Sequence, residues 1–471
     1  MSEQQQDTEA PQAPQPKSRP VGGTEYSWCR AVPGGTGITV AVLLLSKPPD
    51  FPLLQNALHK LQISYPILRS RLRFDTAANT FSFVTPLSPH LQIQLFDQNK
   101  TAEILQSLPN PTSPFHQIVE HELNQNSWCD FDSSLNPEFD LLFSSVYNLG
   151  GGEWVLALRL HTTACDRVAA TALVRELVER EWGEEGNLER ETEVGLAIEG
   201  CIPSGKANKP FWARGMDMLG YSLNAFRLAN LDFVDTVSPR SSRVLRLQMD
   251  SGETDRLLNG CKLRGIGLCG VLAAAGLIAA RSSKCLPDDQ WEKYGVITLI
   301  DCRQILDPVL GSQNIGFYHS AILNTHDMRG SENLWDLAER TYSSFANSKK
   351  NNKHFSDMAD LNFLMCRAIE NPGLTPSSSL RTSLISVFEE PVTDHFSKTH
   401  GEIIGLQDYI VCGSVHGVGP SMSVFDTFRD GKLDCIFVYP SPLHSREQMQ
   451  KVVDEMNRIL VEAISCPEIE K

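Results

Sequence analysis

A histidine and an aspartate lie in a polar turn between a predicted strand and a predicted helix. The strand covers residues 154–160, the turn contains His161 and Asp166, and the helix follows over 168–177. Histidine is the side chain best suited to general base catalysis near neutral pH, and a carboxylate beside it can orient the ring. The turn is therefore a candidate catalytic site. Cys165 offers a nucleophile that His161 would activate, although a cysteine just before a helix is more often small apolar filler.

The spacing of apolar residues predicts the elements that must position this turn. Segment 154–160 is mostly apolar, as in a buried strand, whereas apolar residues recur at helical spacing in 168–177. The β-branched segment 36–45 is predicted as another buried strand. Further strands are predicted at 68–74, 80–84, 139–147, 242–248, 296–300, 384–388, 422–428 and 433–439, and further helices at 52–61, 116–126, 211–228, 253–263, 334–347, 355–369 and 445–464.

Composition predicts where the chain divides. Residues 1–20 are rich in Gln and Pro, and acidic residues with little apolar periodicity crowd 179–199. We expect four parts: a disordered tail at 1–34, a first domain at 35–190, a linker at 191–240 and a second domain at 241–471.

Gly265, Gly267 and Gly270 match the GxGxxG pattern of dinucleotide-binding proteins. That pattern needs a strand directly before it, whereas 253–263 has the pattern of a helix, with Ser251 as its candidate N-cap. The favoured interpretation is a helix that ends at Gly265 and a tightly packed helix of small residues after it.

The polar turn resembles the HHxxxDG motif of the superfamily that includes condensation domains, BAHD acyltransferases and chloramphenicol acetyltransferase. His161 falls on the first histidine and Asp166 on the aspartate. Thr162 stands where the superfamily has its second, catalytic histidine, and Arg167 where it usually has glycine. The motif therefore indicates a fold more clearly than a reaction.

Three more segments extend the resemblance from about residue 35 onward, in the order that the superfamily has them. The sequence at 65–71 is similar to YPxLRxRL, and 301–308 is similar to DxRxxLxP. The segment 414–420 resembles the DFGWGKP loop of the BAHD branch without its Asp and Trp. The resemblance implies an α/β fold of two chloramphenicol-acetyltransferase-like subdomains, each a mixed β-sheet with flanking helices, with an active-site tunnel between them.

The resemblance also implies roles for single residues. In the superfamily the second motif histidine takes a proton from an alcohol or amine, which then attacks a thioester carbonyl. A threonine hydroxyl does not accept protons near pH 7, but it can donate a hydrogen bond to substrate or to a developing oxyanion. Asp166 is expected to bridge to Arg303. Gly417 and Gly419 are expected to hold their loop against the tunnel.

Several histidines compete for the role of base. His416, in the glycine-rich loop, is the substitute that the resemblance favours, and a solvent-exposed loop histidine is the alternative. Strand geometry through residue 162 places His161 and Thr162 on opposite faces, so we expect a buried, hydrogen-bonded His161 and a Thr162 that lines the cavity. His319, His400 and Asp426 are further candidates by position alone.

Composition limits the partners. The 471 residues carry a formal net charge of −15, which argues against nucleic acid or anionic membrane as a general partner. The longest apolar runs are too short to span a bilayer. The 12 cysteines show no CxxC pair or Cys/His ligand spacing, so we expect reduced thiols and no metal. With no signal-peptide pattern, we expect a cytoplasmic protein. We also expect a monomer.

The favoured function is acyl transfer from acyl-CoA, as co-substrate and without another cofactor, to a hydroxyl or amine of a small molecule. The retained alternatives are a different reaction in the same tunnel and a non-catalytic ligand-binding or regulatory descendant of the fold. Thr162 at the base position favours the non-catalytic alternative.

Overall fold

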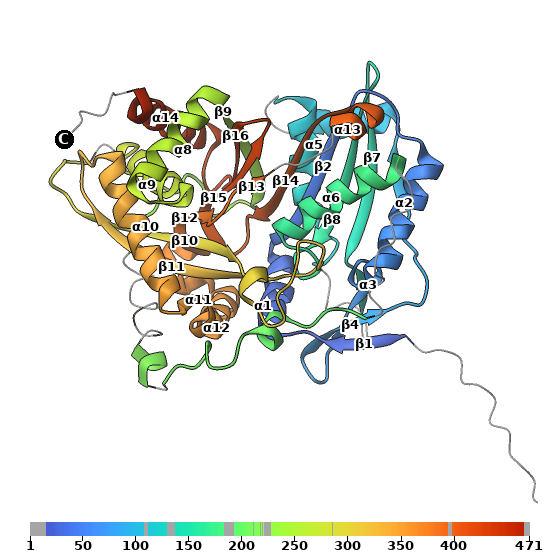
Figure 1. Cartoon of the computed structure of the whole chain (residues 1–471), viewed down its shortest axis with the longest axis horizontal. Helices are drawn as coiled ribbons and strands as arrows, with labels where there is room; N and C mark the ends of the chain where they lie inside the picture. Colours follow the sequence, from blue (N-terminus) through green and yellow to red (C-terminus); the bar gives the residue numbers. More distant parts are fainter. Residues whose placement is uncertain are drawn as a thin grey trace, which may run out of the picture.

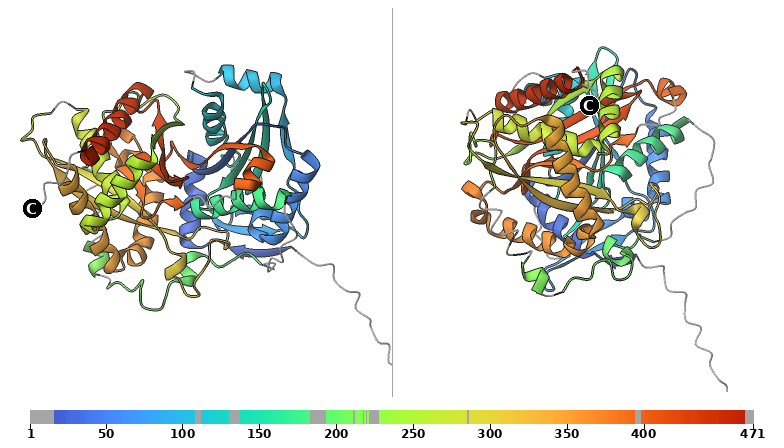
Figure 2. Two further views of the ribbon diagram at one scale, coloured as in Figure 1. Left: turned by 45° about the horizontal axis from the view of Figure 1, so that its top comes forward. Right: turned by 60° about the vertical axis from the view of Figure 1, so that its left-hand side comes forward.

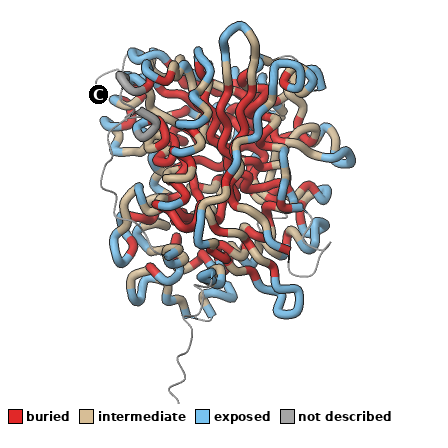
Figure 3. The backbone as a smooth tube through the Cα atoms, turned by 90° about the vertical axis from the view of Figure 1, so that its right-hand side faces the viewer, coloured by how far each residue is buried: buried red, intermediate tan, exposed pale blue. Residues whose placement is uncertain are grey.

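The chain folds into two lobes that lie side by side (Figure 1). The computed structural model describes residues 16–107, 112–129, 137–182, 193–210, 212–216, 218, 220, 228–284, 286–393 and 398–465. The buried residues run through the middle of the molecule, and many of the exposed ones lie on the outer loops (Figure 3). The structure is a mixed α/β fold, as the sequence predicted.

The first lobe is built on a five-stranded mixed sheet. Alternate residues of β2 point to opposite faces: Ala41 and Leu43 belong to the core under α2 and α6, and Val40 and Val42 to the core under α5. Both faces are thus buried, which explains why the sequence of β2 is almost continuously apolar. The strand order is β14 (Leu406–Val415), β2 (Thr36–Leu45), β8 (Glu153–His161), β7 (Leu142–Gly150) and β5 (Ile93–Phe96), and the helices are α2 (Phe51–Ser64), α4 (Gln98–Ser107), α5 (Pro114–Asn124) and α6 (Arg167–Trp182).

The second lobe is built on a seven-stranded mixed sheet. Figure 2 shows helices packed on its outer face, including the last helix, α14 (red). On β10, Val296 and Ile300 belong to the core on that side, whereas Ile297 and Leu299 face the first lobe and line a cavity. The strand order is β11 (His319–Met328), β10 (Glu292–Asp301), β12 (Arg381–Phe388), β15 (Gly419–Arg429), β16 (Lys432–Ser441) and β9 (Ser241–Met249), with β13 (Val392–Thr393) beside β15. The helices are α8 (Ser251–Arg264), α9 (Leu268–Ser282), α10 (Leu334–Lys350), α11 (Lys353–Ser356), α12 (Met358–Glu370) and α14 (Arg446–Ser465). Helix α13 (Lys398–Ile404), although it lies between strands of this half of the chain, packs on α6 and β14 of the first lobe.

Strand β14 joins the lobes. It comes from the C-terminal half of the chain, yet it pairs antiparallel with β2 at the edge of the first lobe's sheet (Figure 1). The boundary predicted between 190 and 241 therefore does not separate the two sheets. The sequence gives no sign of this exchange, because strand pairing between distant segments is not encoded locally.

The predicted disordered tail is too long. Residues 17–34 form β1 (Lys17–Pro20), α1 (Gly23–Ala31) and a short 3-10 turn. The reason is packing: Cys29 is fully buried in the core, and Arg19 pairs with Glu25, whose carboxylate also caps α1. Strand β1 completes a small sheet with β4 (Thr80–Thr85), β3 (Arg71–Asp75) and β6 (Glu138–Asp140).

The glycine pattern at 265–270 marks a helix junction. Helix α8 ends at Gly265, which is in the left-handed conformation at φ 63°, and α9 begins three residues later. The N-cap of α8 is Asp250, one residue before the predicted Ser251. Gly270 lies so close to Tyr342 of α10 that a Cβ would clash. The glycines thus serve helix packing, as the favoured interpretation predicted.

Within the described ranges, no single helix is long and apolar enough to cross a membrane. The bent pair α8 and α9 meets that criterion together, by length and composition only. Most of the predicted helix 211–228 lies outside the described residues.

Candidate functional site

A cavity of about 410 Å³ lies between the lobes. Its size is within the range of small-molecule sites. Most of its lining is apolar, with side chains such as Trp28, Leu299, Phe317, Met365 and Phe425. The polar residues that border it include Thr36, Thr162, Arg167, His319, Arg381, Ser386 and Ser423.

The turn after β8 divides its two neighbouring residues between cavity and core. Thr162 borders the cavity, next to Gly37 of β2. His161 is completely buried, and its Nδ1 lies 2.7 Å from the hydroxyl oxygen of Thr163 and accepts from the Thr163 backbone N–H at 3.2 Å. Its ring also meets Trp128 edge to face at 5.3 Å. The structure therefore places the two residues as strand geometry predicts.

Burial removes His161 from consideration as a base. It lowers the pKa of the ring to about 3, so His161 is neutral at pH 7. Its Nε2 is enclosed and has no hydrogen-bond partner among the described residues. A substrate cannot reach this ring without opening the core.

Asp166 is the most heavily bonded residue of the turn. Its Oδ2 lies 2.9 Å from Nη2 of Arg303 and accepts from the Tyr318 backbone N–H at 2.9 Å, while Oδ1 accepts from the Ala169 N–H in the first turn of α6. Burial alone would raise the pKa of this carboxyl, but Arg303 and then His319 outweigh it and hold the pKa well below its usual range. Asp166 is ionised and ties the two lobes together.

His319 stands beside Asp166 on the cavity wall. It begins β11, it is 4% exposed, and its Nδ1 lies 3.0 Å from Oδ2 of Asp166, within ion-pair distance but poorly aligned as a hydrogen bond. Phe317 and Phe388 flank the ring at 6.1 and 5.8 Å. Because Nδ1 is turned to the carboxylate, Nε2 is the nitrogen left for a ligand in the cavity. Sequence position gave His319 only as a lesser candidate.

Arg167 fills the place of the motif glycine with a charged side chain. Its Nη1 lies 3.0 Å from Oδ1 of Asp426 on β15, in a buried ion pair that crosses between the lobes. The guanidinium also lies 4.3 Å from the ring centre of Phe388. Burial raises the pKa of Asp426, and Arg167 opposes that rise. Asp426 is thus the partner of a cavity residue and is not itself on the cavity wall.

His416 lies beside the cavity wall but is not part of it. Its Nδ1 lies 3.0 Å from Oγ of Ser242, and its ring packs so closely on Gly35 that a Cβ there would overlap it. Burial, followed by Arg381, lowers the pKa of the ring to about 4. The expected orientation of His416 toward the cavity is not what the structure shows, because Ser242 and Gly35 hold the ring.

The two glycines of this loop differ in position. Gly417 packs against the backbone of Gly34, where a Cβ would approach the carbonyl oxygen to 2.5 Å. Gly419 borders the cavity itself. The loop therefore does lie against the site, with Val418 and Gly419 and not His416 on its inner side.

The remaining candidates contribute little. Cys165 is fully buried, and burial followed by Asp166 raises the pKa of its thiol well above the usual value, so it is not an activated nucleophile. The side chain of His400 lies outside the described residues. Among the described residues, no cluster of three or more His, Cys, Asp or Glu side chains could hold a metal ion.

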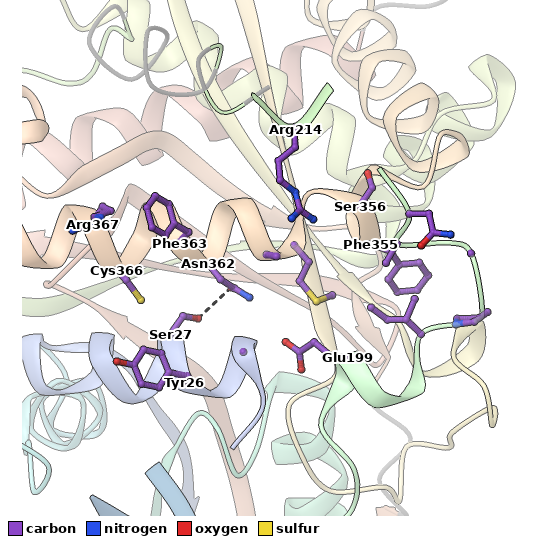
Figure 4. Close-up of a pocket in the computed structure, with 18 of the residues that line it drawn as sticks. Tyr26, Ser27, Glu199, Arg214, Phe355, Ser356, Asn362, Phe363, Cys366 and Arg367 are labelled. Atoms are coloured by element: carbon purple, nitrogen blue, oxygen red, sulfur yellow. Dashed lines mark hydrogen bonds between the residues drawn. The ribbon is translucent and has the colours of Figure 1, made fainter. Parts of the chain in front are cut away.

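A second, outer pocket of about 640 Å³ adjoins the cavity along α12 (Figure 4). Met358, Asn362 and Arg367 of this helix border both spaces. In Figure 4, Asn362 points across to Ser27 of α1, whose hydroxyl donates to it at 3.2 Å. The Asn362 amide also donates to Thr24 at 2.9 Å. These bonds hold α1 and α12 together where the outer pocket meets the cavity.

Comparisons with known proteins bear on the fold. Residues 238–347 match the family described as phthiocerol/phthiodiolone dimycocerosyl transferase C-terminus. Polyketide synthase associated protein 5 from Mycobacterium tuberculosis is 17% identical, with a TM-score of 0.65 over 95% of this chain and 98% of that one. The chain has the condensation-domain fold. No curated protein matches it by sequence.

Two other solved structures share this fold. The trichothecene 15-O-acetyltransferase from Fusarium sporotrichioides is 10% identical, with a TM-score of 0.69 over 95% of each chain. The EpoB cyclization-docking bidomain from Sorangium cellulosum is 14% identical, with a TM-score of 0.69 over 96% of this chain and 86% of that one. The resemblance inferred from the motifs is thereby confirmed at the level of the fold.

Two polar residues of the cavity escaped the sequence analysis. Arg381 opens β12 and Thr36 opens β2, and both border the cavity. A charged residue at the start of a strand that holds no other charge is the only signal that could have pointed to Arg381. Its environment is set by residues distant in the chain.

Proposed function

We propose that the protein transfers an acyl group from a thioester to a hydroxyl or amine in the central cavity, with His319 as the general base. The observation that carries this proposal is the position of His319, which borders the same cavity as Thr162 and has Nδ1 beside the ionised Asp166. A carboxylate next to one ring nitrogen stabilises the imidazolium that forms when the other nitrogen takes a proton.

The reaction would run through a tetrahedral intermediate. Nε2 of His319 accepts the proton of the acceptor's hydroxyl or amine as its oxygen or nitrogen attacks the thioester carbonyl carbon. The carbonyl oxygen becomes an oxyanion, to which the hydroxyl of Thr162 donates a hydrogen bond. Collapse breaks the carbon–sulfur bond, and the imidazolium returns its proton to the thiolate. Substrates and products then balance as thioester plus acceptor against acylated acceptor plus thiol.

The mostly apolar lining supports an acyl chain as occupant. We propose acyl-CoA as donor and no further cofactor. The outer pocket along α12 is the space through which its thioester arm would approach, because it adjoins the cavity at Asn362 and Arg367. The cytoplasmic location and the monomeric state stay predictions. Sedimentation velocity measures the oligomeric state.

Thiol release tests the proposal. Purified protein is given acetyl-CoA, octanoyl-CoA or palmitoyl-CoA with 1-octanol or octylamine, and both free thiol and acylated product are measured. His319→Gln should lower turnover about 100-fold or more, the usual contribution of a general base. His326→Gln is the matched control, because His326 is a buried histidine of the same strand that does not border the cavity. Unchanged turnover in His319→Gln would reject the assignment.

A non-catalytic ligand-binding protein is the second candidate, favoured by Thr162 at the position of the catalytic histidine. The same preparation separates the two functions. Saturable binding of an acyl-CoA without thiol release, for every donor and acceptor pair, supports the binding protein. Thiol release that depends on His319 supports the enzyme.

A further inference from the structure

Arg381 is a buried cation without an acidic partner. The residue is 2% exposed and borders the cavity at the start of β12. Its guanidinium is held by backbone carbonyls: Nε donates to Ser379, and Nη1 donates to Val415 and Pro420. Its Nη2 has no hydrogen-bond partner among the described residues.

Other buried arginines of the described chain are neutralised. Arg303, Arg167 and Arg159 each lie within 3.0 Å of a carboxylate oxygen. No described carboxylate comes within ion-pair distance of Arg381, and Arg240 donates to the same Ser379 carbonyl, which places a second cation beside it. A buried charge is costly unless it is paired. The end of the cavity at Arg381 therefore carries an excess of positive charge.

Thr36 supplies a second unpartnered donor. Its hydroxyl is buried and has no partner among the described residues, and the residue borders the cavity. Thr36 is paired with Val415 in the β2–β14 ladder, and Val415 is also the residue whose carbonyl accepts from Arg381. Thr36 and Arg381, which come from different lobes, thus both lie beside Val415.

We infer that this end of the cavity binds the carboxylate of an otherwise apolar ligand, with Arg381 and Thr36 as the donors. A carboxylate supplies both the missing negative charge and acceptors for both donors. A phosphate, with its greater charge and three terminal oxygens, would need more donors than this end of the cavity offers. The apolar lining between Arg381 and His319 suits a hydrocarbon body.

This inference is independent of acyl transfer, because it concerns binding only. If the proposed reaction also holds, the carboxylate belongs to the acceptor or to the distal end of the acyl chain. The substrate class is then an apolar carboxylic acid.

Decanoic acid is the test ligand, compared by isothermal titration calorimetry with 1-decanol and decylamine. Decanoate should bind the wild-type protein about tenfold to a hundredfold more tightly than decanol, the range expected for charge-assisted hydrogen bonds, and decylamine should bind weakest. With decanoic acid labelled with ¹³C at the carboxyl, NMR titration should show a lower pKa bound than free. Equal affinity for acid and alcohol, or a bound pKa that is raised, would overturn the inference.

Variants locate the site. Arg381→Met and Thr36→Val should each remove most of the preference for decanoate over decanol. If Arg381→Met does not fold, Thr36→Val alone tests the site. The matched control is Arg281→Met, because Arg281 is also buried and donates to backbone carbonyls, but away from the cavity. It should keep the preference. A preference that survives in both Arg381→Met and Thr36→Val would place the carboxylate elsewhere.

Discussion

Two regions beside the cavity, the turn after β8 and the start of β12, hold buried charge in opposite ways. In the turn after β8, Asp166 and Arg167 each have an oppositely charged partner in the second lobe, Arg303 and Asp426. At the start of β12, Arg381 is held by carbonyl oxygens alone. Buried charges near the cavity thus differ in role. The paired ones link the two lobes, and the unpaired one is available to bind a ligand.

The largest effect is expected at Asp166. Asp166→Ala leaves Arg303 buried without its main partner, so the free energy of unfolding should fall by about 3 to 5 kcal/mol. Thermal melting followed by circular dichroism measures the loss. Asp166→Asn, which keeps the shape and removes the charge, should recover only part of it. A melting temperature unchanged in both variants would remove the contrast between the turn after β8 and the start of β12.

Arg381→Met should cost less than Asp166→Ala. No carboxylate is stranded, and the loss is limited to the hydrogen bonds that three carbonyls receive, about 1 to 3 kcal/mol. Melting of the two variants side by side, without ligand, makes the measurement. The opposite ranking would mean that Arg381 is a structural residue first.

The Arg167–Asp426 pair should behave as a unit. Because it is buried and joined by a single short contact, a double-mutant cycle with Arg167→Met and Asp426→Leu should give a coupling of about 1 to 3 kcal/mol, with the double variant more stable than the sum of the single losses predicts. Additive losses would show that the ion pair does not fasten the lobes.

The pH dependence of stability tests the burial of His161. Its folded pKa is about 3, below the unfolded value of about 6.5. Below about pH 6.5 the unfolded chain takes up a proton that the folded chain does not, so stability falls as pH drops toward 3. At pH 5.5 the contribution is on the order of 1 kcal/mol. His161→Gln should remove this contribution, so its melting temperature should fall less steeply than that of the wild type as the pH drops below 6.5. An unchanged pH dependence would show an accessible ring.

The smallest effect on stability is expected at Thr162. Thr162→Val preserves shape at a position that borders the cavity, so the free energy of unfolding should change by about 0.5 kcal/mol or less. Turnover or ligand affinity should change nonetheless, because the hydroxyl is lost. His161→Ala, one residue away, should do the reverse and mainly lower the melting temperature.

The sequence predicted the elements whose own apolar pattern identifies them. Strands β2 and β8 were found because both faces of each are buried, and α6 because its apolar residues follow helical spacing. Strand β11 was missed because it lies at the edge of its sheet and mixes polar with apolar residues. Strand β14 was missed because Gln407, Asp408 and Gly413 interrupt its apolar residues.

The site was predictable where a motif carried it. The turn with Thr162 and Asp166, and the approach of Arg303 to Asp166, followed from the resemblance. Arg381 could not be predicted, since its surroundings join residues 379, 415 and 420 through tertiary contacts. The ring of His416 was misplaced because the loop pattern gives the backbone path but not the pocket at Gly35 and Ser242.

The exchange of β14 limits how this polypeptide could be divided or recombined. A fragment that ends before residue 406 would leave one edge of β2 without its neighbour, and an unpaired apolar edge invites aggregation. Neither half made alone has a complete set of strands, so the two halves should become soluble only when they are produced together. A chimera with a relative would keep its fold only if its breakpoints fall on both sides of 406–415, so that this segment comes from the same parent as the first lobe.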